Sequence, residues 1–431
     1  ATRESAGAVT VPSVFAVAAF IILAGFAGKI LFQRTRIPDI PILLGIGILM
    51  GPVFHLVGTD VLLPLAPYVG TLALLMIMLE GGMSLDVDRV LSQLKWAVAL
   101  TLLAFVTTTL AIAGAYHAAT GTPLAESLLL GGLLGCTSGA VVIPLVQGMR
   151  MGQNARTILT LEAALGDALA VVTVFVLLRY IRTPSPGLGG HLLSTANAFV
   201  WSGIPGAVAG LLWVRILART GKLPLSYMLT MAGMLLLYAL VEALHASGVF
   251  AVLVFGMVLS NGDVIMRWIP SPSKEASWEA SRFALDETIG WFHEEMAFLA
   301  RVFFFVYLGM LMDFGRISPF FLGVSAALIA IIYAARQVSV RAIGYLGRRE
   351  VPFERKILTT MAPRGLASAV LATVPAAEGI AGTEVFIQYA FAVIAVTNVL
   401  LTVSTIRSER RLDRILAETA RAAGDSDRGE P

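Results

Sequence analysis

The sequence is poor in the residues that a soluble protein of its length needs. Only 14% of its 431 residues are charged, and it contains a single cysteine, Cys136. A soluble domain carries about 25% charged residues, so the low charge excludes an ordinary soluble protein. One cysteine excludes an intramolecular disulfide. The net charge is only +3, and the basic residues fall in short segments, so we expect no nucleic-acid partner.

Motifs that would indicate an enzyme or a channel are missing as well. A zinc protease needs HExxH, and His293-Glu294-Glu295 does not continue to a second histidine. The segment Leu165-Gly166-Asp167 is only faintly similar to the GxGD motif of aspartyl proteases, because no partner aspartate lies in mid-span. A selectivity filter such as TVGYG is not present. We therefore predict that the protein is not an enzyme and has no bound cofactor.

What the sequence does have is long apolar runs. Hydrophobic residues make up 57% of the chain and the mean hydropathy is +0.82. Many runs reach about 20 residues, the length of a helix that crosses a bilayer. We predict an all-α polytopic membrane protein with about 13 transmembrane helices. The predicted spans lie near residues 11–31, 40–58, 64–83, 96–116, 125–147, 157–180, 192–214, 223–243, 247–262, 290–312, 318–340, 356–376 and 385–405.

The distribution of lysine and arginine predicts the orientation. If the N-terminus lies outside, the outer connections hold only Arg3, Arg179, Arg182 and Arg316. The other basic connections then lie inside, which is the asymmetry that membrane proteins show. We predict a cell (inner) membrane protein with its N-terminus outside and its C-terminus in the cytoplasm. The tail after Arg407 is predicted to be disordered.

Two spans contain helix-breaking residues in otherwise apolar runs. The fifth span contains GGLLGCTSGAVVIPLVQG, and the twelfth contains MAPRGLASAVLATVP. Proline and glycine in mid-span loosen the backbone ladder, which is tolerated where the freed groups line a site. The two spans are seven apart, and this odd offset gives them opposite orientations, as an inverted repeat requires. Simple close packing of small residues is the alternative explanation.

Charged residues inside the predicted spans indicate where a site lies. The sixth span, near Thr157–Leu178, carries Glu162 and Asp167, and a charge near the membrane centre costs about 2.5–3.5 kcal/mol. The two acids lie about 140° apart around the helix, so they face different neighbours. We predict that Glu162 forms an ion pair with Arg364 of the twelfth span. Asp167 would remain free to bind either a proton or a cation, since burial favours the neutral acid and a bound cation the carboxylate.

Glu80 and Arg301 are also predicted to lie within the membrane, and Glu242 lies near the end of its span. Glu80 lies near the inner end of the third span, within reach of the interface. Arg301 is ambiguous, because it can pair with Asp167 or Glu162 in the interior, or locally with Glu294 or Glu295. We treat Arg301 as a candidate additional charge in the core of the bundle.

In their order and spacing these segments resemble the monovalent cation:proton antiporter superfamily. LEAALGDALAVV is similar to the ESGxND-type helix of its NhaP/NHE-like branch, and MAPRGLASAVLA to the arginine–glycine helix of that branch. TSGAVVIPL stands where the branch has its TDP-type unwound segment. LALLMIMLEGGMSLD also resembles a superfamily segment, and FFFVYLGMLMD has Kef-like features. The resemblance covers roughly residues 40–405.

The resemblance implies an NhaA/NapA-like antiporter fold, with inverted repeats and two crossed broken helices. It implies a homodimer that exchanges Na⁺ or K⁺ for H⁺ by elevator-type alternating access and serves pH homeostasis. An N-terminal extra transmembrane helix (1–31) would precede the antiporter membrane domain (32–405), and a cytoplasmic tail (406–431) would follow. Dimerisation helices would lie within about 11–83 and 223–312, and core helices within about 96–180 and 318–405.

The resemblance also implies roles for individual residues. Asp167 matches the aspartate that binds the cation (Na⁺ or K⁺) and the proton, and Thr137 matches the threonine of the unwound helix. Glu162 and Arg364 match the structural ion pair. Gly166 stands where the branch has asparagine or a second aspartate, and Ser138 where many sodium-selective members have aspartate.

These departures predict the transport properties. With one free acid, exchange is expected to be electroneutral and one-for-one. The candidate ligands that remain are Asp167, the hydroxyls of Thr137, Ser138 and Thr160, and backbone carbonyls, a set that suits potassium at least as well as sodium. The alternative is an anion or carboxylate transporter of similar broken-helix architecture, in which Arg364 and helix N-termini hold the substrate.

Overall fold

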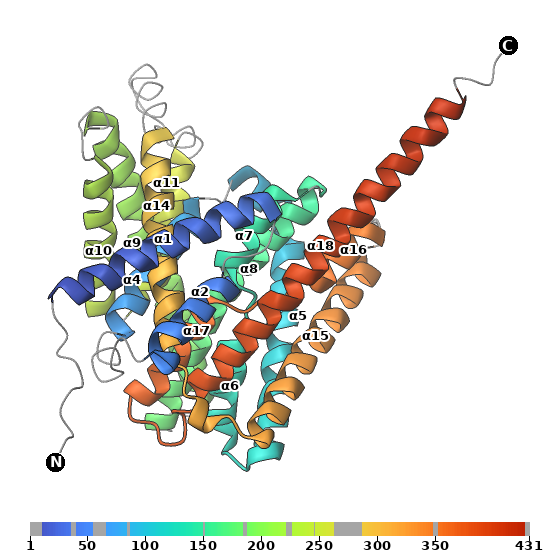
Figure 1. The fold of residues 1–431 in the computed structure, drawn as a ribbon. Coiled ribbons are helices and arrows are strands. Elements are labelled where there is room, and N and C mark those ends of the chain that lie inside the picture. Colours follow the sequence, from blue (N-terminus) through green and yellow to red (C-terminus); the bar gives the residue numbers. More distant parts are fainter. Residues whose placement is uncertain are drawn as a thin grey trace.

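The described part of the chain is helical. The computed structural model describes residues 11–35, 40–54, 66–83, 87–149, 151–183, 188–220, 226–244, 246–262, 287–347 and 352–426 (Figure 1). Within these ranges it contains helices and short turns and no strand. Each predicted span corresponds to one helix or to one interrupted helix pair, so the prediction of an all-α polytopic fold is confirmed.

The helices form two groups, which lie beside each other in Figure 1. We call the first the panel group; its helices α11 and α14 pack against several of the others. It consists of α1 (Val11–Thr35), α2 (Ile40–Ile48) with its π-helical extension (Leu49–Val53), α4 (Ala66–Met83), α9 (Leu188–Thr220), α10 (Ser226–Ala243), α11 (Gly248–Ser260) and α14 (Glu287–Met310).

The second group, which we call the core group, carries the interrupted helices. It consists of α5 (Val87–Thr120), α6 (Leu124–Gly135), α7 (Gly139–Gly148), α8 (Gln153–Arg182), α15 (Pro319–Gly347), α16 (Pro352–Thr360), α17 (Leu366–Ala377) and α18 (Phe386–Ser426). A short 3₁₀ helix, Phe314–Arg316, joins α14 to α15. Helix α8 packs against α5, α6, α7 and α17, so its middle lies inside this group.

Close packing in the panel group depends on glycine. A Cβ atom on Gly47 of α2 would lie 2.1 Å from the Val306 carbonyl oxygen, and one on Gly309 of α14 would lie 2.4 Å from the Leu44 carbonyl oxygen. Any side chain at either position would push the two helices apart. Small residues at helix crossings are the usual means of close association in membranes, where water does not drive helices together.

Five described segments are long and apolar enough to cross a bilayer on length and composition alone. They are Lys95–Thr120, Leu124–Ile143, Gln153–Arg182, Pro319–Tyr345 and Phe386–Arg407. Further apolar helices, mostly in the panel group, are shorter. Helices α5 and α15 extend beyond the predicted spans, which places more residues inside helices than the hydropathy indicated.

The C-terminal tail differs from the prediction. Instead of ending near residue 405, α18 continues as one helix to Ser426, and its last turns project away from the bundle (Figure 1). The segment SERRLDRILAETARAA is rich in alanine, arginine, leucine and glutamate, which are strong helix formers. The end of the tail is rich in glycine, aspartate and serine, which favours disorder, yet the helix includes Gly424, Asp425 and Ser426 as its last residues.

Candidate functional site

The two interrupted helices meet at their breaks. Helix α6 ends at Gly135 and α7 begins at Gly139, whereas α16 ends at Thr360 and α17 begins at Leu366. The Ser138 backbone N–H donates to the Pro363 carbonyl oxygen at 2.9 Å, which joins one break directly to the other. Pro363 explains the second break, because the residue before a proline is disfavoured in helical conformation.

Glycine at position 365 permits this contact. A Cβ atom there would lie 2.1 Å from Ser138 Oγ and 2.7 Å from Ser138 Cβ. No side chain fits in that space, so the two breaks can touch only with Gly365 in place. The predicted pair of broken helices is therefore present, and the glycine of the arginine–glycine motif has a steric function.

Asp167 lies at the point where the breaks meet. Its Oδ2 accepts a hydrogen bond from the Gly139 N–H at 3.1 Å, at the N-terminus of α7. That helix end carries the positive end of the helix dipole, so it favours a carboxylate. Asp167 is 2% exposed, and its Oδ1 has no hydrogen-bond partner among the described residues. An unsatisfied buried carboxylate oxygen calls for a ligand.

Ser138 adds a second buried oxygen. Its side chain is also 2% exposed, and its Oγ lacks a hydrogen-bond partner in the described part of the chain. Thr137, the residue before it, differs, because its Oγ1 donates to Glu162 Oε1 at 3.1 Å. Thus Ser138, more than Thr137, has a hydroxyl free to serve as a ligand beside Asp167.

The partner of Glu162 is a residue that the sequence analysis missed. Glu162 forms an ion pair with Arg336 of α15, and both side chains are buried. The Arg336 Nε also donates to the Leu358 carbonyl oxygen of α16 at 2.7 Å. Arg336 therefore connects the α8 helix to the helix that leads into the second break. The predicted ion pair between Glu162 and Arg364 is therefore wrong, because the arginine that pairs with Glu162 is Arg336.

Arg364 binds backbone carbonyl groups instead. Its Nε donates to the Leu134 oxygen at 2.6 Å, its Nη2 to the Gly135 oxygen at 3.4 Å and its Nη1 to the Ala362 oxygen at 3.2 Å. The first two carbonyls belong to the last turn of α6, where helix carbonyls have no intrahelical partner. The C-terminal end of α6 thus supplies the negative partial charge that stabilises this arginine.

Two residues of α18 hold the backbone of the second break. The Arg364 N–H donates to Thr397 Oγ1 at 3.1 Å, and Asn398 Nδ2 donates to the Arg364 carbonyl oxygen at 2.8 Å. Both side chains are fully buried. A threonine–asparagine pair in an apolar span is a sequence signal that could have identified them, since buried polar groups need partners.

The remaining charges lie beside the site or outside it. The Arg301 Nη1 donates to the Ala140 carbonyl oxygen at 3.3 Å, and its guanidinium lies 5.9 Å from the Phe298 ring centre. Among the described side chains it pairs with neither Asp167 nor Glu162, and Glu295 is exposed. The predicted local partner Glu294 has a side chain that lies outside the described residues. Glu80 of α4 is partly buried.

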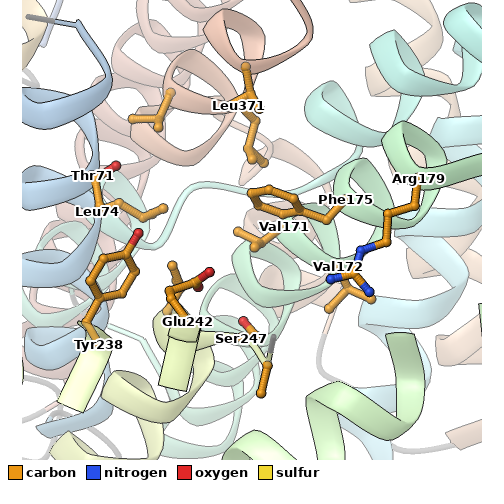
Figure 2. Close-up of a pocket in the computed structure, with 14 residues that line it drawn as sticks. Thr71, Leu74, Val171, Val172, Phe175, Arg179, Tyr238, Glu242, Ser247 and Leu371 are labelled. Atoms are coloured by element: carbon orange, nitrogen blue, oxygen red, sulfur yellow. The ribbon is translucent and has the colours of Figure 1, made fainter. Parts of the chain in front are cut away.

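A cavity of about 130 Å³ lies between the two helix groups, near the end of α8 that carries Arg179. Its lining begins at Val171, about 6 Å along α8 from Asp167. Figure 2 shows Phe175 of α8 directed into this space, with Glu242 of α10 and Arg179 on opposite sides. Glu242 Oε1 accepts the Gly248 N–H at 2.9 Å, at the start of α11.

Comparison with known proteins shows which family the chain matches. A family model described as "Sodium/hydrogen exchanger, transmembrane" matches residues 17–407. The chain is 25% identical over 368 residues to the Na(+)/H(+) antiporter 1 of Methanocaldococcus jannaschii, covering 82% of this chain and 80% of that protein. It is also 25% identical over 399 residues to the K(+)/H(+) antiporter NhaP2 of Shewanella oneidensis, covering 89% of this chain but 64% of that protein.

The solved structures give the same fold. The sodium proton antiporter MjNhaP1 from Methanocaldococcus jannaschii at pH 8 matches with a TM-score of 0.73 and 21% sequence identity. The match covers 94% of this chain and 98% of that one. The likeness therefore extends over both helix groups and both interrupted helices.

Proposed function

Because this chain belongs to the transmembrane sodium/hydrogen exchanger family, we propose that it exchanges a monovalent cation, Na⁺ or K⁺, for H⁺ at Asp167. It is a multi-pass membrane protein of an antiporter family. The observation that carries the proposal is the meeting of two broken helices at two buried oxygens, Asp167 Oδ1 and Ser138 Oγ, which have no hydrogen-bond partner among the described residues.

The exchange follows from competition for one carboxylate. A buried carboxylate is costly unless it is neutralised, and either a proton or a bound cation does this. The second buried acid, Glu162, is held by Arg336, so it is not available for the same competition. One free acid supports one-for-one, electroneutral exchange. Asp167, the Ser138 hydroxyl and the carbonyls freed at the breaks supply the oxygen ligands that alkali cations take.

The proposed movement is elevator-type alternating access. The carboxylate, both breaks and the Glu162–Arg336 pair all belong to the core group, so they can move together as one unit against the panel group. The cavity in Figure 2 lies between these groups, and we propose that it is the outer part of the route to Asp167, with the N-terminus outside and the C-terminus in the cytoplasm. Exposed apolar side chains on α1 and α10 offer surfaces for lipid or for a second copy in a homodimer.

The alternative, an anion carrier built on Arg364, is disfavoured. Three nitrogens of its guanidinium group already donate to backbone carbonyl oxygens of the two breaks. An anion would have to displace these carbonyls, and the side chain is 2% exposed. Arg364 is better explained as a structural clamp on the C-terminal end of α6.

Replacing Ser138 by alanine tests the proposed ligand set. We expect the half-saturating cation concentration to rise about fivefold, because a hydroxyl contact contributes about 1 kcal/mol. The maximum rate and the protein's thermal stability should change little. The measurement is cation-dependent proton movement in proteoliposomes over a range of Na⁺ and K⁺ concentrations. Ser325→Ala is the matched control, because that α15 hydroxyl is also buried without a described partner. An equal effect of both variants would remove Ser138 from the site.

Replacing Glu242 by glutamine tests the cavity as a cation route. The glutamine oxygen can still accept the Gly248 N–H, so only the charge is lost. We expect a several-fold rise in the half-saturating cation concentration at low ionic strength, because a negative charge at a cleft concentrates cations. Added choline chloride should erase this difference by screening.

The matched control for Glu242 is Glu384→Gln, since Glu384 is exposed outside the cavity. A lower maximum rate with unchanged half-saturation in the Glu242 variant would argue against a route through this cavity.

A further inference from the structure

The single cysteine lies inside the proposed cation site. Cys136 follows the last residue of α6 and has extended backbone, with φ −83° and ψ 151°. Its side chain is 2% exposed, and its Sγ lies 3.6 Å from Ser368 Oγ of α17. Asp167 of α8 is close by, since a Cβ atom on Gly166, the residue before it, would lie 3.5 Å from Cys136 Cβ, and its Oδ2 binds the Gly139 N–H three residues after the cysteine. A sulfur atom is thus placed near the carboxylate at which we propose cation exchange.

Glycine at position 166 leaves room for the Cys136 side chain against α8. A Cβ atom on Gly166 would meet Cys136 Cβ at 3.5 Å and the Thr137 nitrogen at 3.6 Å. A longer side chain at this position would therefore extend over the first break, against the cysteine. Because glycine stands there, no side chain of α8 covers Cys136 from this position. Cys136 therefore faces the backbone of α8 at Gly166, next to Asp167.

Independent of the cysteine, the site contains oxygens that lack partners. Asp167 Oδ1 and Ser138 Oγ are buried and make no hydrogen bond among the described residues. Both belong to residues that flank the break next to Cys136: Ser138 follows in the chain, and Asp167 Oδ2 binds Gly139. A thiolate together with a carboxylate forms a mixed ligand pair. Oxygen ligands select hard cations, whereas sulfur selects soft ones.

We propose that this site binds soft monovalent cations, of which Ag⁺ is the probe, between the Cys136 sulfur and the Asp167 carboxylate. The inference rests on the proposed function only in that the ion reaches the site by the route of the transported cation. Binding breaks the S–H bond and forms an S–Ag bond, and the released proton leaves through the Asp167 carboxylate to water. Charge balances and nothing is oxidised. Because the S–Ag bond is strong, the bound ion blocks exchange.

Direct binding is the first test. Silver nitrate would be titrated calorimetrically into the purified, detergent-solubilised full chain, with nitrate salts throughout because chloride precipitates silver. We expect one high-affinity site per chain in the wild type, loss of that site in Cys136→Ser and weaker binding in Asp167→Asn. Sodium or potassium nitrate should compete in the wild type. The same high-affinity binding in Cys136→Ser would overturn the proposal and point to methionine thioethers.

X-ray absorption at the silver edge identifies the atoms bound to Ag⁺ in the wild-type protein, so this test does not require a folded variant. The wild-type protein with one equivalent of Ag⁺ should show one short sulfur neighbour together with oxygen. A shell of several sulfur atoms, or of nitrogen and oxygen alone, would overturn the proposed site. A bulky maleimide should react slowly with the native protein, because a buried thiol is accessible only to small ions.

Transport separates this inference from the proposed function. In proteoliposomes, Ag⁺ should inhibit wild-type exchange, and Cys136→Ser should lose most of that sensitivity relative to its own uninhibited rate. Exchange with equal sensitivity in both proteins would sink the silver site and leave the antiport intact. Silver binding at Cys136 in a protein that moves no cation would keep the site and reject the antiport.

Discussion

Asp167→Asn is expected to reduce cation-driven proton movement to the level of protein-free liposomes. Asparagine keeps the shape of the side chain and can still accept the Gly139 N–H, so the break should stay in place. It cannot take up a proton or carry a negative charge, however, and both are needed when proton and cation compete for one group. The variant should therefore fold and lose all exchange.

The measurement uses proteoliposomes with an imposed pH gradient and a lumenal pH dye. Sodium, potassium, lithium and choline chloride would be added in turn to wild type, Asp167→Asn and the control Glu295→Gln, which alters an exposed acid of α14. Dissipation by a small alkali cation in the wild type and the control, but not in Asp167→Asn, is the expected pattern. Residual exchange near the wild-type rate in Asp167→Asn would place the site elsewhere.

Arg336→Met is expected to destabilise the folded protein strongly. It leaves Glu162 as a buried carboxylate with the Thr137 hydroxyl as its described hydrogen-bond donor. Removing one member of a buried ion pair costs about 3–5 kcal/mol, because the other charge remains unpaired. The contact of Arg336 with the Leu358 carbonyl is lost as well, so the second break also loosens.

A double-mutant cycle assigns this cost to the pair. The double variant Glu162→Gln/Arg336→Met should be much less destabilising than the sum of the two single variants. Each single variant leaves one buried charge unpaired, whereas the double variant leaves none. The readout is the thermal midpoint in detergent, followed by size-exclusion fluorescence. Arg341→Met, which alters an exposed arginine of α15, is the matched control. Additive effects of the two substitutions would contradict the ion pair.

The sequence predicted those features of the site that depend on local residue type. Two carboxylates in the apolar run of α8 indicated the functional helix, because such charges are costly. Proline and glycine in the fifth and twelfth spans indicated both breaks, since these residues interrupt a helix wherever they stand. Both signals indicate Asp167, which lies on the functional helix at the point where the two breaks meet. Its role as the exchanging acid stays a prediction.

Features that depend on packing could not be predicted in this way. Arg336 lies four residues from the inner end of the predicted span 318–340, where a basic residue is expected to reach the interface, whereas α15 continues to Gly347 and buries the arginine. A buried arginine needs negative charge nearby, which predicts a carboxylate partner for Arg364. The carbonyl groups at the end of α6 supply that charge, and they become available only where a broken helix ends beside that side chain.

The central claim is that one carboxylate exchanges a proton for a cation, and proton release on cation binding tests it most directly. The purified protein would be placed in weakly buffered detergent solution, and Na⁺ or K⁺ added while the pH is recorded. The account predicts about one proton released per cation bound in the wild type and none in Asp167→Asn. Cation binding without proton release, or equal release from the variant, would contradict it.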